Sequence, residues 1–234
     1  MATKLSDTAY DELLSRIISC QYPPGSLLSE EKLVAELGIS RTPIRSALIR
    51  LQQEHLVQVI SKKGILVSEI TPEGIRDLFN LRDLIEPYAI REFGGNFKKD
   101  KLIYYLNLFS KKYSKDDYQI VYDSDVQFHT DIVQLTGNTF LCAFYNSLQK
   151  LLSRITLICG ISVTDRVVAS NQEHVEIVLS LLKDDKEFAV AMLETHLKEA
   201  RESAYQAILI QKDRLPESIC RSIFRLLVSV TVRV

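Results

Sequence analysis

The sequence predicts a mainly α-helical protein with two folded units, a small N-terminal unit that ends in a β-hairpin and a larger unit built only from helices. The chain of 234 residues is long enough to form two cores. Residues 29–67 contain two short helical patterns, a glycine-bearing turn between them and an alternating apolar pattern after them. From residue 71 to about residue 211 the apolar residues recur at helical spacing, with no convincing strand pattern.

The first helix of the N-terminal unit, residues 1–70, is expected to begin at a cap formed by Asp7. Tyr10, Leu13 and Ile17 then recur on one face of that helix. The two prolines within residues 22–25 stop it, because neither can continue the hydrogen-bond ladder.

Two shorter helices and a hairpin complete this unit. Ser29 is placed to cap the second helix, which ends at Gly38, and Ser40 is placed to cap the third. The alternating residues that follow predict two strands that pair as a β-ribbon, at 57–60 and 65–68. Two helices and a ribbon with a basic tip describe a winged helix-turn-helix, a module whose second helix enters the major groove of double-stranded DNA.

Positive charge gathers in the segment that would meet DNA. The whole chain has a formal net charge of −1, which argues against a uniform polyanion-binding surface. Within residues 41–63, however, five basic residues face one acid, Glu54. The five are Arg41, Arg45, Arg50, Lys62 and Lys63. Their local concentration outweighs the nearly neutral total, and Arg50 is the one best suited to neutralise a phosphate.

The second unit, residues 71–212, is predicted to be an all-helical bundle of six or seven helices. Thr71 and Pro72 mark its start, because threonine caps a helix and proline opens one well. Pro87 is expected to bend the first helix. The helical patterns cover 73–95, 100–113, 117–136, 138–160, 171–183 and 186–211. Residues 213–234, whose last valines alternate as in a strand, receive no assigned role.

Cysteine usage and hydropathy indicate a cytoplasmic protein. The four cysteines are scattered, with no Cys-x-x-Cys pair, and the polar N-terminus carries no secretory signal. Free thiols in a reducing compartment are therefore expected. No apolar run approaches the roughly 20 residues that a membrane span needs, so a membrane is not expected as a partner.

One helix of the second unit carries a carboxylate and an imidazole at helical spacing. Asp125 and His129 are four residues apart and so point toward the same place, whereas Asp123 fits the repeat less well. Two more of the four histidines, His174 and His196, lie in this unit on other helices. An aspartate with three imidazoles suits a divalent transition metal, with zinc the first choice and nickel or manganese possible. Residue types alone favour an ordinary exposed or hydrogen-bonded role for each histidine over a role as a metal ligand.

The N-terminal third carries an ordered pattern made of Pro24-Gly25-Ser26, Leu28-Ser29-Glu30, Leu33, the run Leu37-Gly38-Ile39-Ser40-Arg41-Thr42-Pro43-Ile44-Arg45, Ala47-Leu48, Leu51, Leu56-Val57 and Gly64. In this pattern it resembles the GntR family of bacterial transcription regulators. The resemblance implies base or phosphate contacts by Arg41, Thr42 and Arg45, and backbone or minor-groove contacts by Lys62, Lys63 and Gly64. The chain departs from the family at Glu31, where an arginine is usual, so its operator sequence is expected to differ.

The second unit carries a second pattern, made of the run 81–87, then Asp125, Phe128-His129, Gly137-Asn138, His174 and His196-Leu197. In these residues it resembles the helical FCD ligand-binding domain of the FadR-type subfamily. This resemblance implies that Asp125, His129, His174 and His196 hold a metal ion. It also implies a homodimer that binds a pseudo-palindromic operator and responds to a small carboxylate effector.

An open coordination position on such a metal would accept one effector oxygen, and an arginine could take the other. Arg82 is the first candidate, because a planar guanidinium suits a carboxylate, although an i,i+4 pair with Glu86 is an equal alternative. Arg154 and Asn146, on one helix, are weaker candidates.

Three functions fit these observations. The first is a transcription regulator, most often a repressor in this family, controlled by an organic acid. The second is a metal-dependent hydrolase or lyase with a DNA-binding head, but no His-Glu-x-x-His motif, glycine-rich phosphate loop or nucleophile elbow supports it. The third is a constitutive DNA binder whose metal is purely structural. The sequence favours the first and predicts no enzyme.

Overall fold

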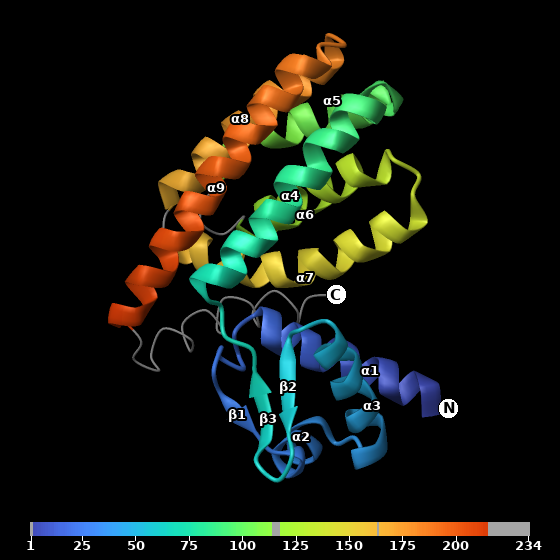
Figure 1. Cartoon of the computed structure of the whole chain (residues 1–234), viewed down its shortest axis with the longest axis vertical. Coiled ribbons are helices and arrows are strands. Elements are labelled where there is room, and N and C mark those ends of the chain that lie inside the picture. Colours follow the sequence, from blue (N-terminus) through green and yellow to red (C-terminus); the bar gives the residue numbers. More distant parts are fainter. Residues whose placement is uncertain (1, 114–117, 163, 215–234) are drawn as a thin grey trace. The chain divides into compact units, whose positions relative to one another are not determined.

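The computed structural model describes residues 2–113, 118–162 and 164–214, and these residues divide into two compact units. The first unit covers Met1–Ile70 and the second Thr71–Gln211, and Figure 1 shows each of them. The fold is mainly helical, as predicted, with a small sheet confined to the first unit.

The first unit is a winged helix-turn-helix. Its three helices pack on a three-stranded antiparallel sheet in which β3 is the central strand. In chain order the elements are α1 (Ala2–Ile18), β1 (Leu27–Leu28), α2 (Glu30–Leu37), α3 (Arg41–Gln53), β2 (Val57–Ile60) and β3 (Gly64–Val67). The core is apolar and includes the fully buried Leu13, Ile17, Leu33, Ile44 and Leu51.

Helix ends in this unit follow the predicted chemistry at α2 but not at α1 or α3. Ser40 stands at the N-cap position of α3, but its side chain makes no capping hydrogen bond. The Ser29 hydroxyl accepts a hydrogen bond from the Lys32 amide, and Gly38 ends α2 in the left-handed conformation. The sequence predicts that Asp7 caps α1. This prediction is wrong, because the helix already begins at Ala2. Asp7 lies inside the helix, and its carboxylate instead pairs with Arg50 of α3 at 2.7 Å.

The strand β1 was not predicted. It is only two residues long, so it shows no alternating pattern that the sequence could reveal. Its pairing with β3, Leu27 opposite Leu66 and Leu28 opposite Ile65, is set by tertiary contact. The wing is therefore held on both sides of β3.

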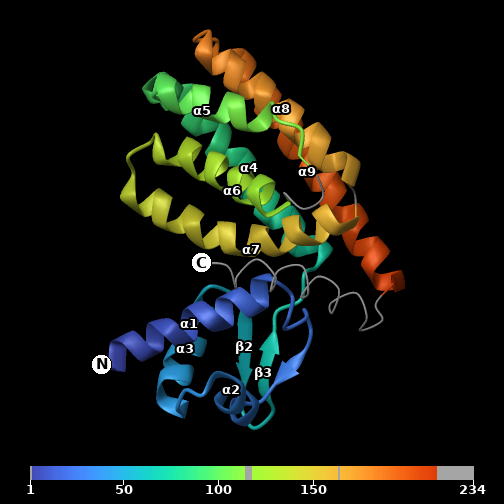
Figure 2. The same cartoon turned by 180° about the vertical axis from the view of Figure 1, so that it is seen from behind.

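The second unit is an all-helical bundle. Its elements are α4 (Pro72–Phe93), the short 3-10 helix η1 (Gly94–Asn96), α5 (Lys99–Phe109), α6 (Tyr118–Gln134), α7 (Thr139–Ser162), α8 (Thr164–Leu182) and α9 (Lys186–Arg214). Thr71 caps α4 by accepting from the Gly74 amide, and Pro72 opens the helix. Helices α8 and α9 lie side by side in both views (Figure 2), and α4 packs against α6.

Three boundaries in this unit differ from prediction by three residues or more. Helix α5 ends at Phe109 and not near residue 113. Helix α8 begins at Thr164 and not near residue 171. Its first residues show no clear apolar stripe from which a helix could be predicted. Helix α9 continues to Arg214, so the expected tail starts within it, and residues 215–234 lie outside the described residues.

The main core of the bundle joins α4, α5, α6, α8 and α9. It contains aromatic residues of α5 and α6, with Tyr105 packed edge-on against Phe128 at 5.0 Å between ring centroids. A smaller cluster of Ile85, Val133, Tyr145 and Leu148 attaches α7 to α4 and α6. Among the described helices, none combines the length and apolarity that crossing a membrane requires.

Gly64 provides a test of the wing. Its φ is +125°, and a Cβ atom there would stand 2.4 Å from the Leu28 carbonyl oxygen of the neighbouring strand. We expect Gly64→Ala to lower the free energy of unfolding by roughly 2–4 kcal/mol, because both the backbone conformation and the β1–β3 pairing are disturbed. Urea denaturation followed by circular dichroism measures this.

The matched control is Gly38→Ala. Gly38 also has a positive φ, +65°, but a Cβ atom there meets nothing within 4 Å. Its substitution should cost only about 1 kcal/mol, the backbone term alone. Equal losses for the two variants would contradict the close approach of β1 and β3.

Candidate metal centre and nucleic-acid interface

The helical bundle brings together the four residues that the sequence singled out as metal ligands. Asp125 and His129 come from α6, His174 from α8 and His196 from α9, and one ligand atom of each lies within 4.8 Å of all the others. The Nε2 atoms of His129 and His174 are 3.2 Å apart. Asp125 Oδ1 lies 3.6 Å from His174 Nε2 and 4.0 Å from His129 Nε2.

Carboxylates behind two of the rings fix their orientation. Glu86 Oε2 lies 2.7 Å from His129 Nδ1, and Glu173 Oε2 lies 2.7 Å from His196 Nδ1. A carboxylate can only accept, so in each pair Nδ1 carries the proton and Nε2 keeps a free lone pair. This arrangement, with a carboxylate behind a histidine, is the one that metal-binding histidines generally have.

The donor set fits a transition metal. Tetrahedral coordination at zinc–nitrogen distances near 2.0 Å places ligand atoms roughly 3.3 Å apart, close to the spacing seen here. All three imidazoles are buried, and Nδ1 of His174 has no hydrogen-bond partner among the described residues. Asp123, the alternative carboxylate, is exposed, which favours Asp125.

Glu86 connects the metal ligand His129 to Arg82. It is fully buried, and its Oε1 accepts from Arg82 Nε at 2.6 Å and from the Tyr145 hydroxyl at 2.5 Å. Burial opposes ionisation of Glu86, but the charge of Arg82 and the hydrogen bond from His129 hold its pKa well below its usual range. Burial and the Glu86 charge in turn raise the pKa of Tyr145. The i,i+4 pair of Arg82 and Glu86 is thus present.

Glu173 is held in the same way from the other side. The two terminal nitrogens of Arg166 bind its two oxygens, each at 2.6 Å. Burial opposes the charge of Glu173, but hydrogen bonds from His196 and Arg166 lower its pKa to about 2. Burial lowers the pKa of His174 well below its usual value and lowers that of His196 as well.

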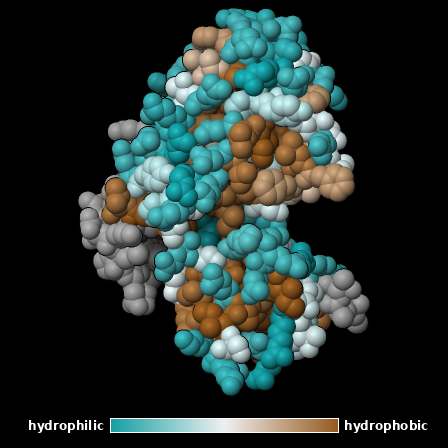
Figure 3. All heavy atoms as spheres, viewed as in Figure 1, coloured by the Kyte–Doolittle hydropathy of each residue, from teal (hydrophilic) through white to brown (hydrophobic). Residues whose placement is uncertain are grey.

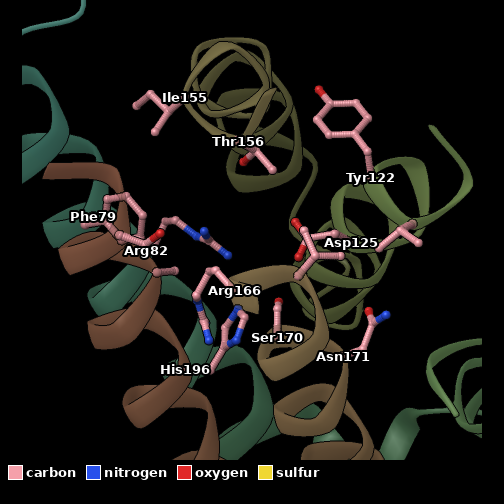
Figure 4. A pocket seen from close by; sticks show the side chains of 14 residues that line it. Phe79, Arg82, Tyr122, Asp125, Ile155, Thr156, Arg166, Ser170, Asn171 and His196 are labelled. Atoms are coloured by element: carbon pink, nitrogen blue, oxygen red, sulfur yellow. The ribbon is translucent and has the colours of Figure 1, made fainter. Parts of the chain in front are cut away.

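A cavity of about 80 Å³ is lined by two of the four ligands, Asp125 and His196. Figure 4 shows Arg82, Asp125, Arg166 and His196 gathered around it. Arg82 is 6% exposed, and its Nη2 has no hydrogen-bond partner among the described residues. The rest of the lining is largely apolar and neutral polar, and includes Phe79, Val121, Tyr122, Ile155 and Asn171.

Two residues predicted to bind an effector are not among those that line this cavity. Asn146 is exposed, because Tyr145 takes the inward position on this turn of α7. Arg154 is fully buried, but its neighbours Ile155 and Thr156 line the cavity in its place. Arg82, the third residue predicted to bind an effector, does line the cavity. Arg166, which the sequence did not single out, lines it as well.

The predicted DNA-contacting residues lie on α3 and on the turn between β2 and β3. Arg41, Thr42 and Arg45 are exposed on α3, and Lys62 and Lys63 are exposed beside Gly64 at the wing tip. Arg50 is less available, since its guanidinium stacks on the Tyr10 ring at 3.8 Å in addition to its pair with Asp7.

Comparison with known proteins agrees with both units. The family model of bacterial regulatory proteins of the gntR family matches residues 5–67, and the FCD domain model matches residues 77–199. The chain therefore belongs to the GntR family, in the branch that carries an FCD domain. It is a DNA-binding transcription regulator and not an enzyme.

Individual relatives match most of the chain or its second unit. The transcriptional repressor RspR of Escherichia coli K12 is 25% identical over 201 residues, which cover 84% of this chain and 87% of RspR. A GntR regulator from Rhodococcus sp. RHA1 superposes with a TM-score of 0.72 at 22% identity, over 86% of this chain and 97% of that one. The Zn²⁺-bound FCD domain of TM0439 matches with a TM-score of 0.50 at 22% identity, over 60% of this chain and 98% of that one.

Two of the buried histidines, His174 and His196, predict how the stability of the metal-free protein depends on pH. Their folded pKa values lie below the unfolded value near 6.5, so the unfolded chain binds more protons once the pH falls through about 6.5. We expect the free energy of unfolding to fall between about pH 7 and pH 5, by up to about 1.4 kcal/mol per pH unit for each histidine. The contribution of Glu173 is lost only below about pH 4.5 and falls outside this window.

Urea denaturation of chelator-treated protein at several pH values measures this dependence. A His55→Asn variant, altered in the N-terminal unit, should keep the dependence of the helical unit unchanged. Stability that stays level or rises on acidification would contradict the burial of neutral imidazoles.

Proposed function

We propose that the protein is a repressor whose DNA binding is controlled by a small carboxylate bound beside a metal ion in the helical unit. The observation that carries this proposal is the cavity lined by two of the four candidate ligands, Asp125 and His196, where Arg82 has a buried donor without a hydrogen-bond partner among the described residues. A buried unsatisfied donor is costly unless something binds it.

The proposed metal ligands are Asp125, His129, His174 and His196, with zinc as the first choice and nickel or manganese as alternatives. The spacing of the four donors and the carboxylates behind two of the rings support this assignment. The related FCD domain of TM0439, which binds Zn²⁺, supports it further. When bound, such an ion supplies a Lewis-acid position for an effector oxygen.

The effector is proposed to be a small organic acid. The Nε of Arg82 already donates to Glu86. Its terminal Nη2 has no hydrogen-bond partner among the described residues and can donate to one carboxylate oxygen of the effector. Both terminal nitrogens of Arg166 donate to Glu173. Arg166 therefore contributes positive charge to the cavity but has no free pair of donors for the effector carboxylate. A volume of about 80 Å³ suits a molecule of only a few heavy atoms.

On the DNA side, we propose that Arg41, Thr42 and Arg45 contact bases or phosphates in the major groove. Lys62, Lys63 and Gly64 would contact the backbone or the minor groove, and Arg50 a phosphate. Two copies of the chain would read a pseudo-palindromic operator with half-sites about one helical turn apart.

A second copy of the chain is proposed to bind through the helical unit. Leu84 and Tyr88, four residues apart on α4, are exposed, as are Phe140 and Phe144 on α7. Both helices contribute to one apolar cluster, and Figure 3 shows hydrophobic side chains gathered on this unit. Exposed apolar residues in such number are typical of a protein interface.

Control of DNA binding would pass through α4. This helix begins at Pro72, five residues after the end of β3, and carries both Arg82 and Glu86. An effector that binds one arrangement of the dimer more tightly shifts the population toward that arrangement. The kinship with the repressor RspR supports release of repression as the outcome.

A thermal-shift assay on the full chain tests metal and effector together. We expect zinc to raise the melting temperature of the wild type, and a small organic acid from a panel to raise it further, because both bind only the folded state. His129→Ala should abolish both shifts. Arg82→Gln should keep the zinc shift but lose the shift produced by the acid.

The control for His129→Ala is His55→Asn, which alters the remaining histidine in the other unit and should leave both shifts intact. A zinc shift with no response to any acid would favour a structural metal in a constitutive DNA binder. Loss of the zinc response in Arg82→Gln but not in His129→Ala would contradict the proposed site.

A further inference from the structure

Two glutamates at the start of α2 reach the arginines of the recognition helix α3. Glu30 and Glu31 are consecutive, yet each pairs with a different arginine, Glu30 with Arg45 and Glu31 with Arg41. These arginines are the exposed cations at the N-terminal end of α3, where this module contacts base edges. The two pairs differ in geometry.

Glu30 binds Arg45 through the inner nitrogen of the guanidinium. Arg45 Nε donates to both carboxylate oxygens, at 2.9 and 3.0 Å, and the Glu30 side chain is only 24% exposed. Among the described residues no hydrogen bond engages the terminal Nη1 and Nη2 of Arg45. The hydrogen bond from Arg45 also lowers the pKa of Glu30, so the carboxylate stays ionised. Arg45 is thus oriented while its two outer donors remain available for guanine O6 and N7.

Glu31 binds Arg41 through an outer nitrogen. Its Oε1 lies 3.3 Å from Arg41 Nη2, and both side chains are largely exposed, at 69% and 60%. The contact therefore occupies one of the donors that DNA would need. A carboxylate in this place also repels phosphate and reduces the counterion release that drives non-specific binding.

We propose that the two glutamates have opposite effects on DNA binding: Glu30 positions Arg45 for base readout, whereas Glu31 competes with DNA for Arg41 and limits non-specific binding. Glu30 is then a positioning residue and Glu31 a specificity-determining one. This inference rests on the proposed DNA contacts of Arg41 and Arg45.

The consequence is a difference between specific and non-specific affinity. Without Glu31, Arg41 is free for a phosphate, so affinity rises for any duplex and discrimination falls. Without Glu30, Arg45 keeps its charge but loses its orientation. Binding to the operator then weakens while binding to unrelated DNA changes little.

The test uses the full chain and two duplexes, one selected by the wild type from a random library and one scrambled from it. Fluorescence anisotropy gives the affinity for each between about 50 and 200 mM salt. Glu31→Gln should strengthen scrambled binding by about 3-fold or more, with a salt slope steeper by about 0.9. Glu30→Gln should weaken selected binding by about 10-fold and change scrambled binding by less than about 2-fold.

Glu12→Gln is the matched control. It removes the same charge from the same unit, but this carboxylate pairs with Arg16 of α1 and not with an arginine of α3. Its effect on the two affinities should be small. A double-mutant cycle with Arg41→Gln then shows whether Glu31 acts through Arg41, because Glu31→Gln should have little effect in that background.

The outcomes distinguish failure of this inference from failure of the proposed DNA contacts. If Arg41→Gln and Arg45→Gln leave selected binding unchanged, the proposed DNA contacts are wrong. If those variants weaken binding but the two glutamate variants shift both affinities alike, the division of roles is overturned. An effect of Glu31→Gln that persists in full without Arg41 would also overturn it, since that result describes a general charge effect.

Discussion

The buried carboxylate of Glu86 is the interaction on which the helical unit's proposed chemistry depends. It accepts hydrogen bonds from a candidate metal ligand, His129, from the candidate effector anchor, Arg82, and from Tyr145. A buried charge of this kind is tolerable only when its partners are all in place. The same contacts that stabilise Glu86 therefore fix both the imidazole of a candidate metal ligand and a guanidinium that lines the cavity.

This arrangement explains why metal and effector would be linked. His129 and Arg82 share the carboxylate of Glu86, so a change in the charge or position of either residue alters the hydrogen bonding and electrostatics of the other. By thermodynamic linkage, a metal that favours effector binding must be favoured by the effector to the same extent. Glu173 has the same role for His196, with Arg166 as its cation, so both sides of the candidate metal centre are supported by charge pairs.

Much of the fold and of the candidate metal site could be predicted from the sequence, because short local patterns indicate the helices, their ends and the face that a residue occupies. The four-residue spacing of Asp125 and His129 placed both on one face of a helix, and Ser29, Gly38 and Thr71 marked helix ends by their own chemistry. The predictions that were wrong depended on distant contacts or on weak patterns. Asp7 pairs with Arg50, 43 residues away, and β1 exists only because β3 lies beside it. Glu86 meets His129 and Tyr145 across 43 and 59 residues, so its shared role could not be read from spacing.

The zinc affinity of a Glu86→Gln variant tests the central claim most directly. The amide keeps the size of the side chain but removes the charge that orients the imidazole of His129 and balances Arg82. Competition against a chelator should show zinc bound about 10- to 100-fold more weakly than by the wild type, while far-UV circular dichroism confirms the fold. Unchanged zinc affinity in a folded variant would contradict the account, because His129 would then need no carboxylate behind it.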